Sequence, residues 1–224
     1  SSLSIALLVG PPALANRTAD QVQIGSLSGA YLAARVAEVD DDLPGAIQYY
    51  KRALDFDPDN RQIQQSLMLA LITSGDVKGA LPYAEKLKTV PDVERFSRVA
   101  LSVDAFNAGK YKDAITLLQL VAETDLDRLI TRLMTAWAKV GLSDGKEAVA
   151  DLAALDGPEW FDLFVSYHRA LVAEAAGLPD DADAAYQATI DNGAAGSAAP
   201  ETWLRAAEAY ATFLARKGDK DAAL

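Results

Sequence analysis

The sequence predicts an all-α fold, a right-handed solenoid of stacked antiparallel helix pairs, and two observations lead to that prediction. A self-similar pattern recurs every 34 residues, and apolar side chains follow the three- and four-residue spacing of amphipathic helices. A helix pair of this length is too small to bury its own apolar face, so neighbouring pairs must stack. Because no stretch alternates apolar and polar residues with a period of two, no strand is predicted.

A small residue recurs at one position of the repeat in five successive units. Counted from Leu27, Ala46 is residue 20 of the first unit, and steps of 34 lead from it to Ala80, Ala114, Ala148 and Ala182. We expect this position to lie where the second helix of a unit crosses the first, because only a methyl group or less lets two helices approach closely.

Glycines mark the ends of predicted first helices. Gly75 and Gly109 both stand at position 15 of their units, where a helix ends in a left-handed or tight turn that favours a residue without Cβ. First helices precede these glycines, as the spacing of Leu67 and Leu71 indicates, and second helices follow them.

The first unit, Leu27 to Asn60, carries Ala46, Tyr50, Ala53 and Pro58 at positions 20, 24, 27 and 32. With these residues the chain resembles the tetratricopeptide-repeat family from Leu27 onward. The resemblance implies a superhelix whose inner surface is lined by the first helices and holds a peptide or helix of a partner protein.

The repeats are predicted to cover residues 27–192 as five units. In the fourth unit we expect a longer turn between Gly141 and Ala148, which would put Trp137 at the position of the core tyrosine. The fifth unit keeps Gly177 but has Ser166 where the family has its first-helix tryptophan, so its helix pairing is a firmer expectation than its side-chain register. A linker is expected over 193–199, and 200–224 is expected to be the start of a sixth unit, truncated at its end.

The N-terminal residues have the pattern of a secretory signal. The apolar run Leu3–Val9 is followed by Pro11 and Pro12 and by Ala13-Leu14-Ala15, a small-x-small cleavage site. Residues 1–15 are therefore predicted to be the remnant of a signal peptide, with 16–26 as a linker or N-terminal cap. The alternative is that the apolar run is a cap helix packed on the first repeat. With a signal, the chain resembles exported tetratricopeptide proteins of the Gram-negative periplasm.

The net charge and the absence of cysteine limit the classes of partner and site that this chain can have. The formal net charge of −11 disfavours nucleic acid and anionic membrane surfaces, and it leaves basic partners open, although it also serves solubility. The absence of cysteine removes disulfides, thiolate metal sites and cysteine nucleophiles, and it fits a periplasmic protein. No integral membrane segment is predicted, because the N-terminal run is too short to span a bilayer.

No catalytic, cofactor-binding or metal site is predicted. His168 is the only histidine, so a multi-histidine metal site cannot form within one chain. The run Asp55–Asp59 resembles the start of a calcium loop but lacks its glycine and its bidentate glutamate, and it is better interpreted as a repeat boundary. Acidic pairs for acid–base chemistry stay open, because the sequence does not show which carboxylates converge.

Candidate partner-binding residues come from the first-helix positions that line the inner surface in the family. The chaperone-binding members of the family hold a C-terminal carboxylate with lysine and asparagine in the first unit, and this chain has Tyr31 and Arg35 there. Each aromatic at these positions could instead pack in the core between repeats. The candidates are Tyr31, Arg35, Gln65, Leu69, Phe96, Val99, Val103, Phe164, Tyr167 and His168.

Three functions fit these observations. The leading hypothesis is a non-enzymatic scaffold that binds a protein or peptide in a partly apolar groove and serves in envelope assembly, secretion or polysaccharide export. A second is the recognition arm of a larger enzyme, such as a protease or glycosyltransferase, with its catalytic domain beyond Leu224. A third is a small-ligand or lipid carrier. The sequence predicts no oligomeric state.

Overall fold

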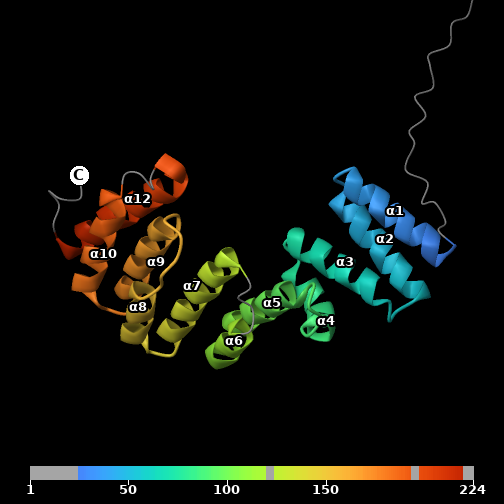
Figure 1. Cartoon of the computed structure of the whole chain (residues 1–224), viewed down its shortest axis with the longest axis horizontal. Coiled ribbons are helices and arrows are strands. Elements are labelled where there is room, and N and C mark those ends of the chain that lie inside the picture. The colour runs from blue at the N-terminus through green and yellow to red at the C-terminus, as the bar shows by residue number, and fades with distance from the viewer. Residues whose placement is uncertain (1–24, 120–123, 193–196, 219–224) are drawn as a thin grey trace, which may run out of the picture. The chain divides into compact units, whose positions relative to one another are not determined.

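The computed structural model describes residues 25–119, 124–192 and 197–218, and in these residues it is helical with no strand (Figure 1). The chain divides into two compact units, residues 1–60 and 61–224. The first contains α1 (Leu27–Val39) and α2 (Leu43–Phe56). The second contains α3 (Arg61–Thr73), α4 (Val77–Leu87), α5 (Glu94–Asn107), α6 (Tyr111–Leu118), α7 (Asp125–Gly141), α8 (Gly145–Ala153), α9 (Phe161–Ala175), α10 (Pro179–Asp191) and α12 (Pro200–Lys217).

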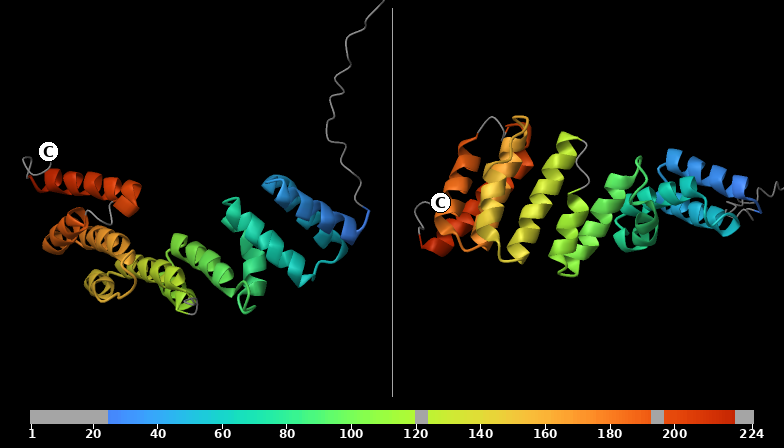
Figure 2. Two further views of the ribbon diagram at one scale, coloured as in Figure 1. Left: turned by 45° about the horizontal axis from the view of Figure 1, so that its top comes forward. Right: turned by 60° about the horizontal axis from the view of Figure 1, so that its bottom comes forward.

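Within the second unit, helices that follow one another in the chain pack as neighbours, α3 on α4, α4 on α5 and so on to α9 on α10 (Figure 2). The first helices also pack directly on one another, since α5 contacts α7, α7 contacts α9 and α9 contacts α12. This stacking of helix pairs is the all-α solenoid that the 34-residue period predicts.

The turn within each described helix pair has one conformation that repeats along the chain. Each turn spans three residues, and the middle residue has a positive φ. These middle residues lie 34 apart in the sequence: Asp41 (56°), Gly75 (82°), Gly109 (71°), Ser143 (66°) and Gly177 (70°). The left-handed conformation explains the glycines, because it brings no steric cost to a residue without Cβ. In the first and fourth pairs Asp41 and Ser143 adopt it instead.

The expected longer turn in the fourth unit is therefore wrong. The α7–α8 turn is residues 142–144, as short as the others, because Ser143 takes the glycine position and α7 continues to Gly141. The expected place of Trp137 is wrong for the same reason. The unbroken period puts Trp137 at position 9 of its unit, the position of Arg35, Leu69 and Val103, and its side chain is half-buried on α7.

The repeated alanine lies in the core of every pair. All five of these alanines, at position 20 of their units, have no exposed surface. Position 24, four residues later on the same helix face, is also buried in every unit, as Tyr50, Ala84, Leu118, Leu152 and Tyr186.

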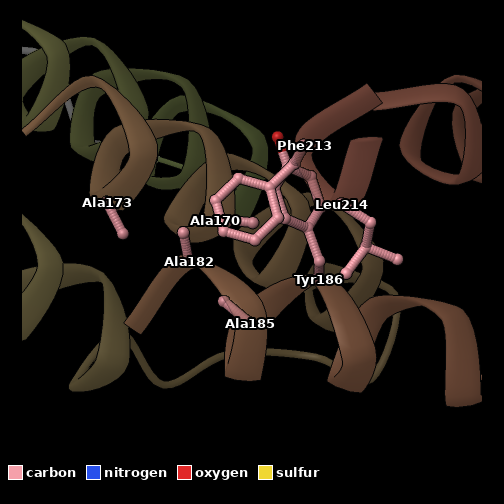
Figure 3. Close-up of a cluster of buried hydrophobic side chains, with 7 residues drawn as sticks. All are labelled: Ala170, Ala173, Ala182, Ala185, Tyr186, Phe213 and Leu214. Atoms are coloured by element: carbon pink, nitrogen blue, oxygen red, sulfur yellow. The ribbon is translucent and has the colours of Figure 1, made fainter. Parts of the chain in front are cut away.

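The C-terminal part of the second unit has a core in which one tyrosine packs among four alanines, a phenylalanine and a leucine. Tyr186 of α10 lies against alanines of α9 and α10 and against Phe213 and Leu214 of α12 (Figure 3). Its hydroxyl donates to Glu174 across 2.8 Å, and burial together with this bond raises the pKa of Tyr186. The fifth pair thus keeps the register of the repeat, including the buried Ala182.

Several expectations fall partly or wholly outside the described residues. These are the signal remnant 1–15, most of the cap or linker 16–26, part of the linker 193–199 and residues 219–224 at the end of the expected sixth unit. The helix α12 begins at Pro200 and ends at Lys217, and Gly218 caps it with a φ of 92°. Pro200 suits the first turn of a helix, where a missing N–H leaves no hydrogen bond unmade.

Candidate partner-binding pocket

Three of the predicted partner-binding residues line one apolar pocket of about 350 Å³ in the second unit. Phe96, Val99 and Val103 contribute from α5, and Leu126 and Ile130 from α7. The rest of the lining comes from Ile72, Val77, Arg95, Ala100, Thr124, Asp127 and Thr131. We call this site the α5–α7 pocket.

The repeat places these side chains on facing positions. Phe96 and Ile130 lie 34 residues apart, at the same position of α5 and α7, and Val99 and Val103 follow Phe96 at helical spacing. Since α5 packs on α7, the two apolar stripes meet along one side of the stack. Exposure shows that the pocket is open to solvent, because Phe96, Leu126 and Ile130 are 37%, 54% and 39% exposed.

A charged pair borders the apolar lining. Arg95 stacks its guanidinium 4.6 Å from the centre of the Phe96 ring and reaches Oδ2 of Asp127 at 3.4 Å. Asp127 also forms a capping box at the start of α7. Its carboxylate accepts from the backbone N–H of Thr124, and the Thr124 hydroxyl accepts from the backbone N–H of Asp127. The rim is therefore polar and fixed in place, whereas the interior is apolar.

The other predicted residues of the second unit lie elsewhere. Gln65 and Leu69 are half-buried on α3, outside the α5–α7 pocket. Phe164 packs its ring 6.3 Å from Trp160 and lines a separate pocket of about 410 Å³. Tyr167 lines a broad hollow of about 940 Å³ between α9 and α12, where its hydroxyl donates to the carbonyl of Arg205. The structure thus divides the predicted groove into several surfaces.

His168 lies at the contact between α7 and α9, outside the α5–α7 pocket. Its Nδ1 accepts a hydrogen bond from the indole N–H of Trp137, and burial lowers the pKa of the imidazole. This environment fits a histidine that links two repeats.

Tyr31 and Arg35 belong to the first unit. The Tyr31 ring lies 6.2 Å from that of Tyr50, and Arg35 pairs with Glu38 on the same helix. None of the ten predicted residues belongs to the fully buried core.

Leu126 and Ile130 were absent from the predicted set. A step of 34 from Phe96 leads to Ile130, so the period contains the signal for it. Ile130 was missed because the longer turn expected in the fourth unit left the repeat position of each α7 residue undetermined. Leu126 lies one turn before Ile130, ahead of the first position of the fourth unit, so the repeat pattern offers no signal for it.

The described residues were also searched for metal sites and for membrane-spanning helices. In the described ranges, no three histidine, cysteine, aspartate or glutamate side chains gather as a metal site would require. The described helices also include none with the length and apolar character needed to cross a bilayer.

This chain is similar to known proteins in its structure. No protein-family model and no curated protein matches the sequence. A tetratricopeptide repeat protein from Parabacteroides merdae matches with a TM-score of 0.65 and 13% identity over 88% of this chain and 75% of that one. The MamA protein matches with a TM-score of 0.61 and 16% identity over 77% of this chain and 94% of that one.

A third match is with the structure of Naa15/Naa10 bound to HypK-THB, with a TM-score of 0.50 and 21% identity over 88% of this chain and 33% of that chain. At these identities the likeness concerns the fold. Together with the 34-residue period, the buried alanines and the repeated turn, it shows that this chain has the tetratricopeptide-repeat fold.

Proposed function

We propose that this protein is a non-enzymatic interaction scaffold and that the α5–α7 pocket holds an apolar side chain of a partner protein. The observation that carries the proposal is the clustering of Phe96, Leu126 and Ile130 around one pocket. Exposed apolar side chains that gather in this way, bordered by polar groups, are typical of protein-binding sites.

The volume and lining indicate what the pocket accepts. Binding sites for whole small molecules span about 300–1,000 Å³, so a pocket of about 350 Å³ is at the small end of that range. A leucine, isoleucine or phenylalanine side chain from a partner segment suits it, because its walls offer apolar contacts. The Arg95–Asp127 pair at the rim can bind polar groups of the same segment.

Site-specific crosslinking tests the proposal. Phe96 is replaced by the photoreactive amino acid benzoylphenylalanine, and Phe56, an exposed aromatic of α2 in the first unit, receives the same replacement as a matched control. After irradiation in the native organism, mass spectrometry identifies the captured proteins. We expect one protein captured from position 96 and not from position 56. Equal capture from both positions, or capture of a small molecule alone, would refute the scaffold proposal.

We also propose that the protein is exported and acts in the cell envelope of a Gram-negative bacterium, in assembly, secretion or polysaccharide export. The apolar run Leu3–Val9, with Pro11, Pro12 and Ala13-Leu14-Ala15 after it, supports export. We expect a periplasmic protein that begins at Asn16 when the full-length gene is expressed in a Gram-negative host. Mass spectrometry of the fractions checks this, and an intact N-terminus found only in the cytoplasm would favour the cap-helix alternative.

A further inference from the structure

The helix α1 exposes an apolar stripe. Leu32, Val36 and Val39 are 64%, 53% and 79% exposed, and their spacing of four and three residues puts them on one side of the helix. A pocket of about 460 Å³ runs beside the stripe and is lined by Gly29, Leu32, Ala33, Val36, Ala37, Asp40, Asp42 and Tyr49. We call this surface the α1 face.

Later repeats show what kind of element covers such a face. Residues 34, 102 and 136 positions after Val36 are Ala70, Ala138 and Val172, and all three are buried, although Asp104 at the remaining position is exposed. In the second unit the second helix of one pair packs on the first helix of the next, as α6 does on α7 and α8 on α9. The position of Val36 is thus one that a neighbouring helix covers, as Val172 clusters with Ala148 and Leu152 of α8, whereas the position of Val39 is exposed in every later pair.

Small residues make room for close contact on this face. Gly29 and Ala33 lie one turn apart in the pocket lining, and with almost no side-chain volume they let the backbone of another helix approach. Leu32 and Val36 then border the contact with aliphatic surface. A helix is the element that matches a straight apolar stripe along α1.

The end of the stripe is acidic. Asp40, Asp41 and Asp42 follow α1 directly and are exposed, and none of them forms an ion pair with a described residue. Asp42 uses one carboxylate oxygen to accept from the backbone N–H of Gly45 at the start of α2. The negative end of the α1 helix dipole adds to these charges, so the surface favours a positive group at this end.

We propose that the α1 face binds an amphipathic helix of another protein, with aliphatic residues at three- and four-residue spacing and lysine or arginine beside Asp40 and Asp41. A second copy of this chain fits less well. Antiparallel pairing of two α1 helices would put each acidic end beside Ser26, Leu27 and Ser28, which offer no cation, and parallel pairing would bring the acidic ends together.

A peptide library tests the proposal on the full chain. A phage library of 16-residue helices with randomised positions is selected on the wild-type protein and depleted on the double variant Leu32→Ser, Val36→Ser. We expect enriched peptides with an aliphatic stripe and at least one lysine or arginine near one end. Failure to enrich any peptide that depends on Leu32 and Val36, or enrichment of acidic peptides, would overturn the proposal.

Affinity measurements on the enriched peptide separate the two parts of the surface. The double variant Leu32→Ser, Val36→Ser should raise the Kd of the peptide at least tenfold. The double variant Asp40→Asn, Asp41→Asn should also raise the Kd, and it should reduce the dependence of the Kd on salt concentration. Leu204→Ser is the matched control, because Leu204 is a similarly exposed leucine on α12 in the other unit. Circular dichroism should show unchanged helix content in all variants.

Light scattering tests whether a second copy of this chain binds the α1 face instead. We expect the mass of one chain at micromolar concentration for the wild type and for the double variant. A mass of two chains in the wild type that falls to one in Leu32→Ser, Val36→Ser would assign the α1 face to a second copy and overturn the proposal.

Discussion

The indole N–H of Trp137 on α7 donates a hydrogen bond to Nδ1 of His168 on α9, across 3.1 Å. The two rings meet edge to face, with their centres 6.5 Å apart. Because the acceptor nitrogen must carry no proton, the bond requires a neutral imidazole with its proton on Nε2. The only histidine of the chain thus joins the fourth repeat to the fifth in a way that depends on its protonation state.

Stability should therefore fall in mildly acidic solution. Burial lowers the pKa of His168 below its usual 6.5, so as the pH falls the unfolded chain takes up a proton before the folded chain does. The contribution of His168 to stability is complete above pH 6.5 and is lost as the pH falls below that value. Urea unfolding at several pH values between about 7.5 and 5.5 measures this.

The control for the pH dependence is His168→Gln, which keeps a hydrogen-bond acceptor and removes the titrating group. We expect the free energy of unfolding of this variant to change less over the same pH range. An equal loss in the variant and the wild type would show that other groups cause the pH dependence.

The alanine position should tolerate no larger side chain. Ala114 has no exposed surface, and replacing it with leucine should lower the free energy of unfolding by about 1–3 kcal/mol through overpacking. Ala188→Leu on the exposed side of α10 should change it by less than about 0.5 kcal/mol. A thermal melt of Ala114→Leu that matches the wild type would contradict the register of the repeat.

The fourth turn should gain from a glycine. Ser143 has a φ of 66°, and a left-handed residue with a Cβ costs roughly 1–2 kcal/mol, so Ser143→Gly should raise the free energy of unfolding by about 0.5–1 kcal/mol after the greater chain entropy of glycine is counted. The matched control is Ala108→Gly in the third turn, where φ is −83° and glycine should destabilise. Destabilisation by Ser143→Gly would mean that the serine side chain stabilises the turn.

Most of the fold could be predicted from the sequence, because the same steric requirements recur every 34 residues. A buried alanine and a left-handed turn residue return at fixed positions, and they mark the helix pairs even where other positions vary. The fourth pair was misjudged because Ser143 adopts a conformation that usually selects glycine. The 34-residue period therefore predicts the position of the turn better than the presence of glycine does.

The candidate site was only partly predictable. Positions of the repeat gave Phe96, Val99 and Val103, which line the α5–α7 pocket together. Leu126 lies outside the repeat pattern, and the position of His168 depends on a hydrogen bond from the neighbouring repeat. Such contacts between repeats depend on side-chain geometry that periodicity does not encode.

The affinity of the crosslinked partner for variants of the α5–α7 pocket tests the central claim most directly. Calorimetric titration compares the wild type with Phe96→Ala, Ile130→Ala and their double variant, and Leu204→Ala on α12 is the control. We predict that each pocket variant raises the Kd about fivefold or more, in line with anchors that contribute about 1 kcal/mol or more, while the helix content stays unchanged. An unchanged Kd in the double variant, with normal folding, would show that the partner binds elsewhere.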